Sequence, residues 1–263
     1  MKLEISVLAS GSSGNSVYVS SPEASLLIDA GLSGKDIEKR MKKVGVYPEE
    51  LDGILITHEH NDHIKGAGVF SRRYDLPLYA NEDTWNQSEK CLGKISTDNC
   101  KIFEGPFSLG NLDVEPFSIS HDAADPVGYI LSCQGQKIGV ATDMGEFSEE
   151  HIQKLKGLDF LVLEANHDLE MLINGDYPSY LKRRIRSSHG HLSNDDTAAL
   201  LPKLVDSNFP KILLAHLSRD NNIPEIAYIT VKNALHNAGL KVGKDLHLDF
   251  TYRDKPTKLY QVG

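Results

Sequence analysis

The amino-acid sequence predicts a layered α/β fold, in which helices lie outside mixed β-sheets. Short apolar runs bounded by Gly, Ser or Pro predict strands, above all in the first half of the chain. Segments with helical periodicity alternate with these runs, as in layered α/β proteins. The 263 residues contain no Ser/Gly linker, low-complexity stretch or repeat, and this length suits one large domain or two closely packed halves. We therefore expect a single domain over residues 1–263.

The predicted strands are short and apolar, and several of them end at a turn signal. Leu3, Ile5 and Val7 alternate along the first strand, as residues on one face of a strand do. Gly110-Asn111 is a strong hairpin signal between two strands, and Gln134-Gly135-Gln136 marks a second hairpin. The predicted strands are Leu3–Leu8, Ser16–Val19, Leu26–Asp29, Gly53–Thr57, Phe107–Leu109, Leu112–Val114, Val127–Ser132, Lys137–Thr142, Phe160–Leu163 and Lys211–Ala215.

Helical patterns alternate with the strands. The predicted helices are Gly34–Val44, Ser148–Lys156, Asn194–Val205 and Pro224–Ala238. Ser148 and Ser193 are the expected N-caps of two helices, because their hydroxyls can accept hydrogen bonds from first-turn N–H groups. Asp196 lies three positions after Ser193 and predicts a loose capping box, whereas His151, three positions after Ser148, is not expected to complete one. Pro202 is expected to kink or split its helix.

The overall composition indicates a globular protein of the cytoplasm. Hydrophobic residues make up 40% and charged residues 25% of the chain, which is ordinary for a soluble domain. No apolar run approaches the roughly 20 residues that span a bilayer, and the first residues lack the pattern of a secretory signal. Three cysteines, Cys91, Cys100 and Cys133, without CxxC spacing favour a reduced protein over a disulfide scaffold.

The formal net charge of −9 argues against a protein that coats nucleic acid without specificity. It does not exclude a nuclease, because bound cations neutralise acidic ligands and recognition depends on the local surface. The eleven histidines are more informative, since several stand beside aspartates in short turns between apolar runs.

The most informative of these turns is His58-Glu59-His60-Asn61-Asp62-His63. It follows an apolar strand and supplies four potential ligands, which are His58, His60, Asp62 and His63. Imidazole and carboxylate together suit divalent zinc, manganese or iron. A solvated polar turn is the alternative, but this order of residues rarely follows an apolar strand by chance. The segment therefore predicts a metal site.

The HxHxDH order resembles the signature motif of the metallo-β-lactamase superfamily. That resemblance implies a four-layer αββα sandwich that holds two metal ions. It implies that one ion takes His58, His60 and His121, and that the other takes Asp62, His63 and His216. Asp143 matches the carboxylate that bridges the ions. Each of the later positions follows an apolar strand. Asp29 resembles an early structural aspartate of the family, and we expect it to support the ligands rather than bind metal.

A second histidine turn, His189-Gly190-His191, resembles the turn that contacts the scissile phosphate in the tRNA-processing nuclease branch. The resemblance implies that His191 binds the phosphate or protonates the leaving oxygen. A plain helix-entry turn stays an alternative for His189. For His167 a supporting role and no role at the site both stay open. His151, His236 and His247 lack ligand-like spacing, and surface or core positions are expected for them.

Two segments favour a nucleic-acid substrate. Residues 181–186 form the densest basic cluster of the chain, and Lys182, Arg183 and Arg184 are expected to contact phosphate. The Gly/Ser turn of residues 9–16 is expected to donate hydrogen bonds to phosphate from Ser12, Ser13 and Asn15. The alternatives are an ordinary charged helix face for the first segment and a simple hairpin turn for the second.

Together, the motifs SGSSGNS, HEHNDH, GHLSNDD and LAHLSRDNN resemble the WalJ/YycJ-type exonuclease branch of the superfamily. This resemblance implies a 5′-to-3′ exodeoxyribonuclease that acts on double-stranded DNA. A metal-bridging hydroxide would attack phosphorus, and Asp62 and His191 are the candidate catalytic residues.

Other functions stay open at this point. They are a small-molecule phosphodiesterase, an RNA-processing nuclease of the same fold, and a metal-stabilised module without catalysis. The stretch between Asp143 and His216 is too short for the large inserted domain of the β-CASP nucleases. Lactamase activity is least favoured, because fold does not dictate substrate. We expect no membrane partner, and homo-oligomerisation is possible.

Overall fold

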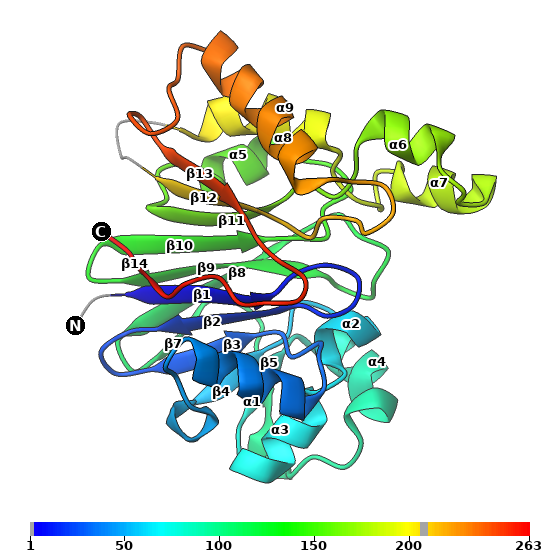
Figure 1. Cartoon of the computed structure of the whole chain (residues 1–263). Coiled ribbons are helices and arrows are strands. Elements are labelled where there is room, and N and C mark those ends of the chain that lie inside the picture. Colours follow the sequence, from blue (N-terminus) through cyan, green and yellow to red (C-terminus); the bar gives the residue numbers. More distant parts are fainter. Residues whose placement is uncertain (1–2, 206–209) are drawn as a thin grey trace. The chain divides into compact units, whose positions relative to one another are not determined.

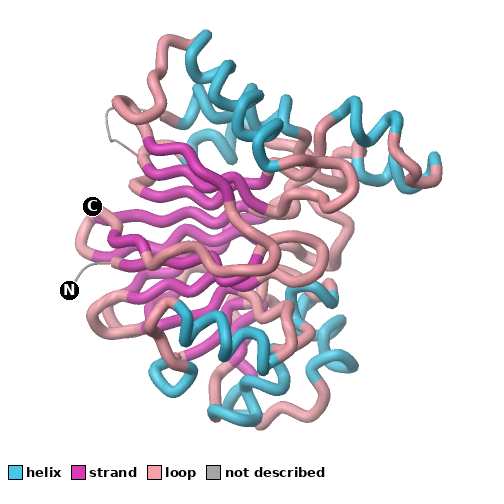
Figure 2. Tube along the Cα trace, viewed as in Figure 1, coloured by secondary structure: helices cyan, strands magenta, loops and turns pink. Residues whose placement is uncertain are grey.

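The computed structural model describes residues 3–205 and 210–263. The chain forms two compact units, each containing strands and helices (Figure 2). Unit 1 comprises Met1–Ser118, Ala123–Gln136 and Thr251–Gly263, and unit 2 comprises Ile119–Asp122 and Lys137–Phe250. The combination of β-sheets with helices in both units confirms the α/β prediction. The expectation of a single domain over residues 1–263 stays a prediction.

Unit 1 contains a seven-stranded mixed sheet. The strand order is β14 (Tyr260–Gln261), β1 (Glu4–Ala9), β2 (Ser16–Ser20), β3 (Ser25–Ile28), β4 (Gly53–Leu55), β5 (Leu78–Ala80) and β6 (Cys100–Ile102). Neighbouring strands from β14 to β3 are antiparallel, and those from β3 to β6 are parallel. The parallel arrangement aligns the carboxyl ends of β3 and β4, and the chain continues from these ends into Asp29 and the His58 turn.

Unit 1 also contains an antiparallel ribbon of three strands, β7 (Phe107–Leu109), β8 (Leu112–Ser118) and β9 (Val127–Cys133). The Gly110 turn joins β7 to β8 as predicted, with Leu109 opposite Leu112. Strand β9 contacts the segment after β4, because the Tyr129 hydroxyl donates to the Ile56 carbonyl at 2.6 Å and the Val127 N–H donates to the Thr57 carbonyl at 3.0 Å. The ribbon thereby supports the strand end that precedes His58.

Four helices complete unit 1 together with two short 3₁₀ turns, Pro48–Glu50 and Thr97–Asn99. Within the described residues of unit 1, the helices are α1 (Gly34–Lys43), α2 (Asn61–Ile64), α3 (Ala67–Tyr74) and α4 (Glu82–Leu92). Ile37 and Met41 of α1 and Phe70 of α3 are fully buried in one core cluster with Leu27 and Ile54 of the sheet. Burial of this apolar face stabilises the sheet from which the His58 turn extends.

Unit 2 is built on parallel strands, in the order β13 (His247–Phe250), β12 (Lys211–Ala215), β11 (Phe160–Glu164) and β10 (Gln136–Ala141). Its longer helices, α8 (Asn194–Leu204) and α9 (Pro224–Asn237), lie along this sheet with α5 (Glu149–Leu155) (Figure 1). Two short helices, α6 (Leu169–Asn174) and α7 (Ser179–Ile185), lie apart from that layer beyond the carboxyl ends of the strands (Figure 1).

Several local expectations are corrected by the structure. Helix α8 runs through Pro202 and is not split. His151 does complete a capping box, because its Nδ1 accepts a hydrogen bond from the Ser148 N–H at 2.9 Å. A neutral imidazole nitrogen is an acceptor and can therefore replace the usual carboxylate. The Ser148 and Ser193 N-caps are confirmed. Within the described ranges, no helix combines the length and hydrophobicity that crossing a membrane requires.

Candidate metal centre

The first group of candidate ligands lies on one turn of unit 1. Strand β4 is fully buried, and the chain leaves it through Ile56 and Thr57. The turn closes where the His63 N–H donates to the His60 carbonyl at 2.8 Å, which begins the one-turn helix α2. His58 and His63 are buried, while His60 and Asp62 are half-buried. The predicted box is thus a hydrogen-bonded turn at the end of a strand, with His58 and His63 buried.

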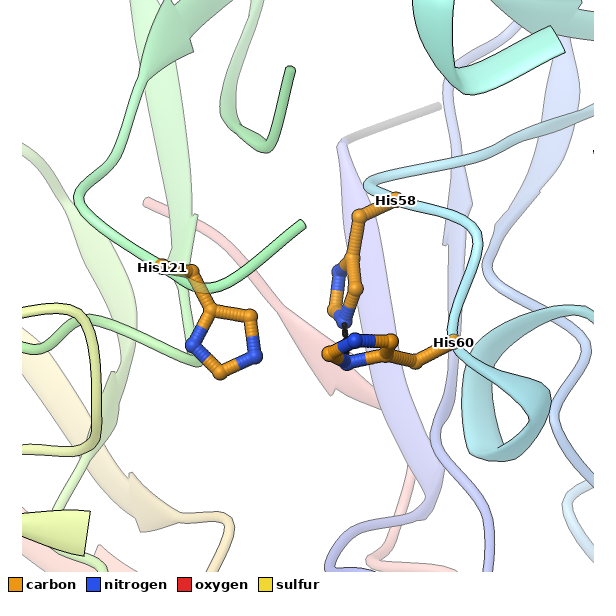
Figure 3. A group of neighbouring side chains, drawn as sticks. All are labelled: His58, His60 and His121. Carbon is orange, nitrogen blue, oxygen red and sulfur yellow. Dashed lines mark hydrogen bonds between the residues drawn. The ribbon is translucent and has the colours of Figure 1, made fainter. Parts of the chain in front are cut away.

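His58 and His60 have their ring nitrogens facing each other. His58 Nε2 lies 3.1 Å from His60 Nδ1 (Figure 3). Two imidazole nitrogens bound to one tetrahedral zinc at about 2.0–2.1 Å would lie roughly 3.4 Å apart. The observed spacing is close to that value, so this pair fits ligands of a shared ion. The third histidine labelled in Figure 3, His121, belongs to unit 2 and is described below.

His63 is fixed by Asp29, as expected for a supporting carboxylate. His63 Nδ1 lies 2.7 Å from Asp29 Oδ2, and the Thr57 N–H and hydroxyl both donate to the same carboxylate at 2.9 and 2.8 Å. Asp29 has a φ of 62°, an uncommon conformation for a non-glycine residue that is often found at functional sites. Nδ1 is therefore occupied by Asp29, and Nε2, which lies 3.7 Å from Asp62 Oδ2, is the atom that a metal ion would take.

The Gly/Ser turn contacts this box through Asn15. The Asn15 Nδ2 lies 3.0 Å from His63 Nε2 and 3.4 Å from Asp62 Oδ2, while its Oδ1 accepts from the Gly11 N–H. Asn15 is buried, whereas Ser12 and Ser13 are exposed on the same turn. The turn is thus more than a simple hairpin connection. A phosphate contact by these three residues stays a prediction.

The second group of donors lies in unit 2, at the carboxyl ends of parallel strands. Asp143 follows β10, Glu164 ends β11, and His216 follows β12. Together with His191 they offer ligand atoms that all lie within 4.8 Å of one another. Asp143 and His216 have φ values of 63° and 55°, so both strand ends leave the sheet through a left-handed residue. Carboxylates and imidazoles in this number are the donors that zinc, manganese and iron take.

Glu164 is the centre of this group, and the sequence interpretation did not assign it a role. Its Oε1 lies 2.8 Å from His191 Nδ1 and 2.9 Å from His216 Nδ1. Its Oε2 accepts from the Met144 N–H at 2.7 Å. Because Glu164 holds both rings by Nδ1, each histidine keeps Nε2 for a metal ion or a phosphate.

The charge on Glu164 is stabilised by the same histidines. Complete burial would by itself raise the pKa of this carboxyl. Attraction to His191 and hydrogen bonds from His191 and His216 outweigh that effect and hold the pKa well below its usual range. Glu164 is therefore a carboxylate at neutral pH.

His121 is oriented by the backbone of the second histidine turn. Its Nδ1 donates to the Gly190 carbonyl at 3.1 Å, and its Nε2 lies 3.4 Å from Asp122 Oδ1 and 4.0 Å from Asp143 Oδ1. Burial lowers the pKa of His121, although the Asp143 charge acts in the opposite direction. His121 is thus held neutral, which is the form that binds metal.

His189 and His167, whose roles the sequence left open, lie in different surroundings. His189 is exposed, and its Nδ1 lies 3.1 Å from the Ser188 hydroxyl. His167 is buried, and neither ring nitrogen has a hydrogen-bond partner among the described residues. Burial lowers the pKa of His167 to about 4. His167 does not belong to the groups of potential ligands in the described part of the chain.

The basic cluster is less uniform than its sequence indicates. The Lys182 ammonium donates to the carbonyls of Ile173 and Gly175 at 2.7 and 2.6 Å, so it holds the end of α6. Arg184 forms an ion pair with Asp122. Arg183 is exposed. The phosphate contacts expected of Lys182, Arg183 and Arg184 stay predictions, and two of these residues already have structural contacts.

Comparisons with known proteins agree on the family. The sequence profile described as the beta-lactamase superfamily domain matches residues 25–215. Exodeoxyribonuclease YycJ of Bacillus anthracis is 45% identical over 264 residues, which cover 100% of this chain and 100% of the relative. Exodeoxyribonuclease WalJ of Streptococcus pneumoniae is 44% identical over 261 residues, which cover 98% of this chain and 97% of the relative.

Solved structures share the fold at low sequence identity. The metallo-β-lactamase fold protein YhfI of Bacillus subtilis gives a TM-score of 0.71 at 15% identity and covers 98% of this chain and 99% of its own. A diphosphatase of the PhnP family gives a TM-score of 0.65 at 19% identity, with 100% and 98% coverage. These structures establish the fold alone, and they confirm the predicted αββα fold class.

Proposed function

The chain belongs to the β-lactamase superfamily, and on this basis we propose that it is a metal-dependent exodeoxyribonuclease. The observation that carries the proposal is the full-length identity of 45% with a relative of that name. The two groups of buried imidazole and carboxylate donors described above support it, because phosphodiester hydrolysis in this kind of site depends on divalent ions. We further propose duplex DNA as the substrate and 5′-to-3′ as the direction.

We propose two ions, zinc, manganese or iron, with ligands drawn from both units acting as one domain. One ion takes His58, His60 and His121, the other takes Asp62, His63 and His216, and Asp143 bridges them. The local geometry of each half supports this assignment: the His58–His60 spacing suits a common ion, and Asp29 and Glu164 leave Nε2 of His63 and His216 as ligand atoms.

Two divalent ions in such a site supply an activated water and neutralise charge on the phosphoryl oxygens. The side chains of this chain then orient the phosphate and move a proton. His191 is the proposed general acid: its Nδ1–H donates to Glu164, which holds the ring in place. As the phosphorus–oxygen bond breaks, His191 gives the Nε2 proton to the leaving oxygen. Asp62 is the other proposed catalytic residue and acts as a ligand in this scheme.

The test is a nuclease assay with manganese on duplexes labelled at a defined 5′ or 3′ end. We expect the wild type to shorten the labelled strand from its 5′ end, and His60→Ala and Asp143→Ala to abolish this activity. His236→Ala, which changes an exposed histidine of α9, is the matched control and should retain the wild-type rate. Equal cleavage by wild type and both ligand variants would contradict the proposal. Hydrolysis of small phosphodiesters without any DNA cleavage would favour the phosphodiesterase alternative.

We also propose a cytoplasmic location. Cys91, Cys100 and Cys133 are all free thiols in the structure, which suits a reducing compartment. Fractionation of cells followed by immunodetection would test this. Recovery in a secreted or membrane fraction would contradict it.

A further inference from the structure

Helices α6 and α7 with their connecting residues, 169–187, form a small arm of unit 2. The arm lies away from the α5, α8 and α9 layer (Figure 1). No residue of α7 is buried. A helix that buries none of its residues contributes little to the core, and its exposed face is available for another function.

The two faces of α7 have different contacts. Leu181, Lys182 and Ile185 are half-buried and share one side of the helix, where Lys182 donates to carbonyls of α6. Tyr180 and Arg183 are exposed and lie three positions apart, hence on the opposite side. The Tyr180 side chain is 67% exposed. An aromatic ring held this far into solvent is typical of a contact surface.

The arm is basic in an acidic chain. The arm carries four cationic side chains, Lys182, Arg183, Arg184 and Arg186, against two acidic ones, Glu170 and Asp176, although the net charge of the protein is −9. Lys182 and Arg184 are committed to carbonyls of α6 and to Asp122. Arg183 and Arg186 are both exposed. Charge complementarity therefore indicates a polyanion as the occupant of this face.

The base of the arm is attached to the candidate metal centre within unit 2. Arg184 pairs with Asp122, the neighbour of His121. The Ser120 hydroxyl donates to the Ser188 carbonyl, and His121 itself donates to Gly190. The carboxyl end of α7 is thus connected to two predicted site histidines. Its Arg184 is linked to His121 through Asp122, and the His191 N–H donates to the Ile185 carbonyl.

We propose that the arm binds the DNA strand outside the metal site, with Arg183 and Arg186 on phosphates and the Tyr180 ring stacked on an unpaired base at the DNA end. Arginine side chains neutralise phosphates, and a base stacks on an exposed aromatic ring without sequence preference. Lys182 and Arg184 position the arm through their contacts with the end of α6 and with Asp122. This inference rests on the proposed exodeoxyribonuclease function and adds a binding surface to it.

The test measures KM and kcat for DNA digestion with manganese over a range of NaCl concentrations. We expect Arg183→Ala/Arg186→Ala to raise KM about tenfold with little change in kcat. The slope of log(kcat/KM) against log[NaCl] should become shallower by roughly 1.8, because each lost phosphate contact removes about 0.9. Lys42→Ala/Lys43→Ala removes the same charge from exposed positions of α1 and should match the wild type.

The stacking contact is tested with Tyr180→Ala and Tyr180→Phe on duplexes with an unpaired end and with a blunt end. Loss of one stacked base costs about 1–3 kcal/mol, so Tyr180→Ala should raise KM about tenfold for the unpaired end and far less for the blunt end. Tyr180→Phe retains the ring and should match the wild type. Tyr47→Ala, an exposed tyrosine of unit 1, is the control.

The outcomes separate the two proposals. A wild type that degrades no DNA contradicts the proposed function, and the arm inference falls with it. If the wild type degrades DNA while the arginine and tyrosine variants keep its KM and salt slope, only the arm inference is wrong. Equal losses in the Lys42/Lys43 and Arg183/Arg186 variants would also overturn it, because the effect would then reflect total charge. Melting temperatures equal to the wild type should accompany each variant.

Discussion

The two groups of candidate ligands, one in each unit, are built in different ways. In unit 1, the potential ligands occupy one turn after a single strand, and the backbone of that turn sets their spacing. In unit 2, the donors come from positions 121 to 216 on separate loops, and a buried carboxylate, Glu164, holds two of the rings. In unit 1 the backbone of the turn thus sets the spacing and Asp29 holds one ring, whereas in unit 2 a single side chain, Glu164, holds two rings.

Among the substitutions that test this difference between the units, Glu164→Gln is expected to lower kcat/KM the most. The amide keeps the shape of the side chain but loses the charge that orients His191 and His216 together. Loss of a partner that orients a ligand typically costs about 10–100-fold, so two affected rings should lower kcat/KM by about 100–10,000-fold. Asp29→Asn disturbs one ring, that of His63, and should lower kcat/KM by about 10–100-fold. Steady-state kinetics at saturating manganese compare the two, and equal losses would contradict the asymmetry.

The next effect concerns backbone packing around the unit 1 turn. This turn should not tolerate an added Cβ atom at Gly31. A Cβ on Gly31 would lie 1.6 Å from the Asp62 carbonyl oxygen, so Gly31→Ala must displace the turn that carries Asp62 and His63. We expect a loss of about 3 kcal/mol or more in the free energy of unfolding, by analogy with the upper range of overpacking. Gly45, with no atom within 4 Å of an added Cβ, provides the control Gly45→Ala, which is strained only by its φ of 80°.

Chemical denaturation of metal-free protein measures both variants. The expected order is wild type, then Gly45→Ala, then Gly31→Ala as the least stable. A Gly31→Ala protein as stable as the control would show that the turn can move without cost.

A pH effect of similar size is expected from His167 in unit 2. Burial lowers its pKa from 6.5 to about 4, so between these values the unfolded chain binds a proton that the folded chain does not. The contribution to stability is complete above pH 6.5 and is lost as the pH falls to about 4. Its maximum is about 3 kcal/mol. The free energy of unfolding, measured in the presence of a chelator, should therefore drop more from pH 7 to pH 4.5 for the wild type than for His167→Asn. Equal drops in the two proteins would contradict this.

The smallest effect is expected at the N-cap of α8. The Ser193 hydroxyl accepts from the Asp196 N–H and donates to the Asp196 carboxylate. Ser193→Ala should cost about 1 kcal/mol of stability, measured by urea denaturation. Because the cap residue Ser193 lies two residues after His191, a simultaneous change in kcat would show that the cap also positions this ring; an unchanged kcat limits its role to stability.

The sequence predicts the parts of this molecule that local patterns encode. The box from His58 to His63 and the strand ends at Asp143 and His216 follow apolar runs, so their positions on the fold could be expected. Strands β5 and β6 have three residues each, too few for a recognisable alternation, and they were not predicted. Helix α4, with the sequence EDTWNQSEKCL, is largely polar, so it lacks the continuous apolar face on which helix prediction depends.

The contacts that order the site could not be predicted in the same way. Glu164 contacts rings that follow it by 27 and 52 positions in the chain, and its only local signal is a carboxylate at the end of an apolar strand. Lys182 and Arg183 are neighbours of the same charge, yet the Lys182 ammonium donates to carbonyls of α6 and Arg183 is exposed. Which of the two side chains contacts α6 depends on how α7 packs against α6, and the composition of the segment does not determine that packing.

The central claim is that residues of both halves hold one pair of ions, and counting bound metal tests it most directly. Titration of metal-free protein with zinc or manganese should give two ions per chain for the wild type, and a lower number or a much weaker second affinity for both His60→Ala and His216→Ala. His236→Ala should bind as the wild type does. Two tightly bound ions in each ligand variant, or none in the wild type, would contradict the account.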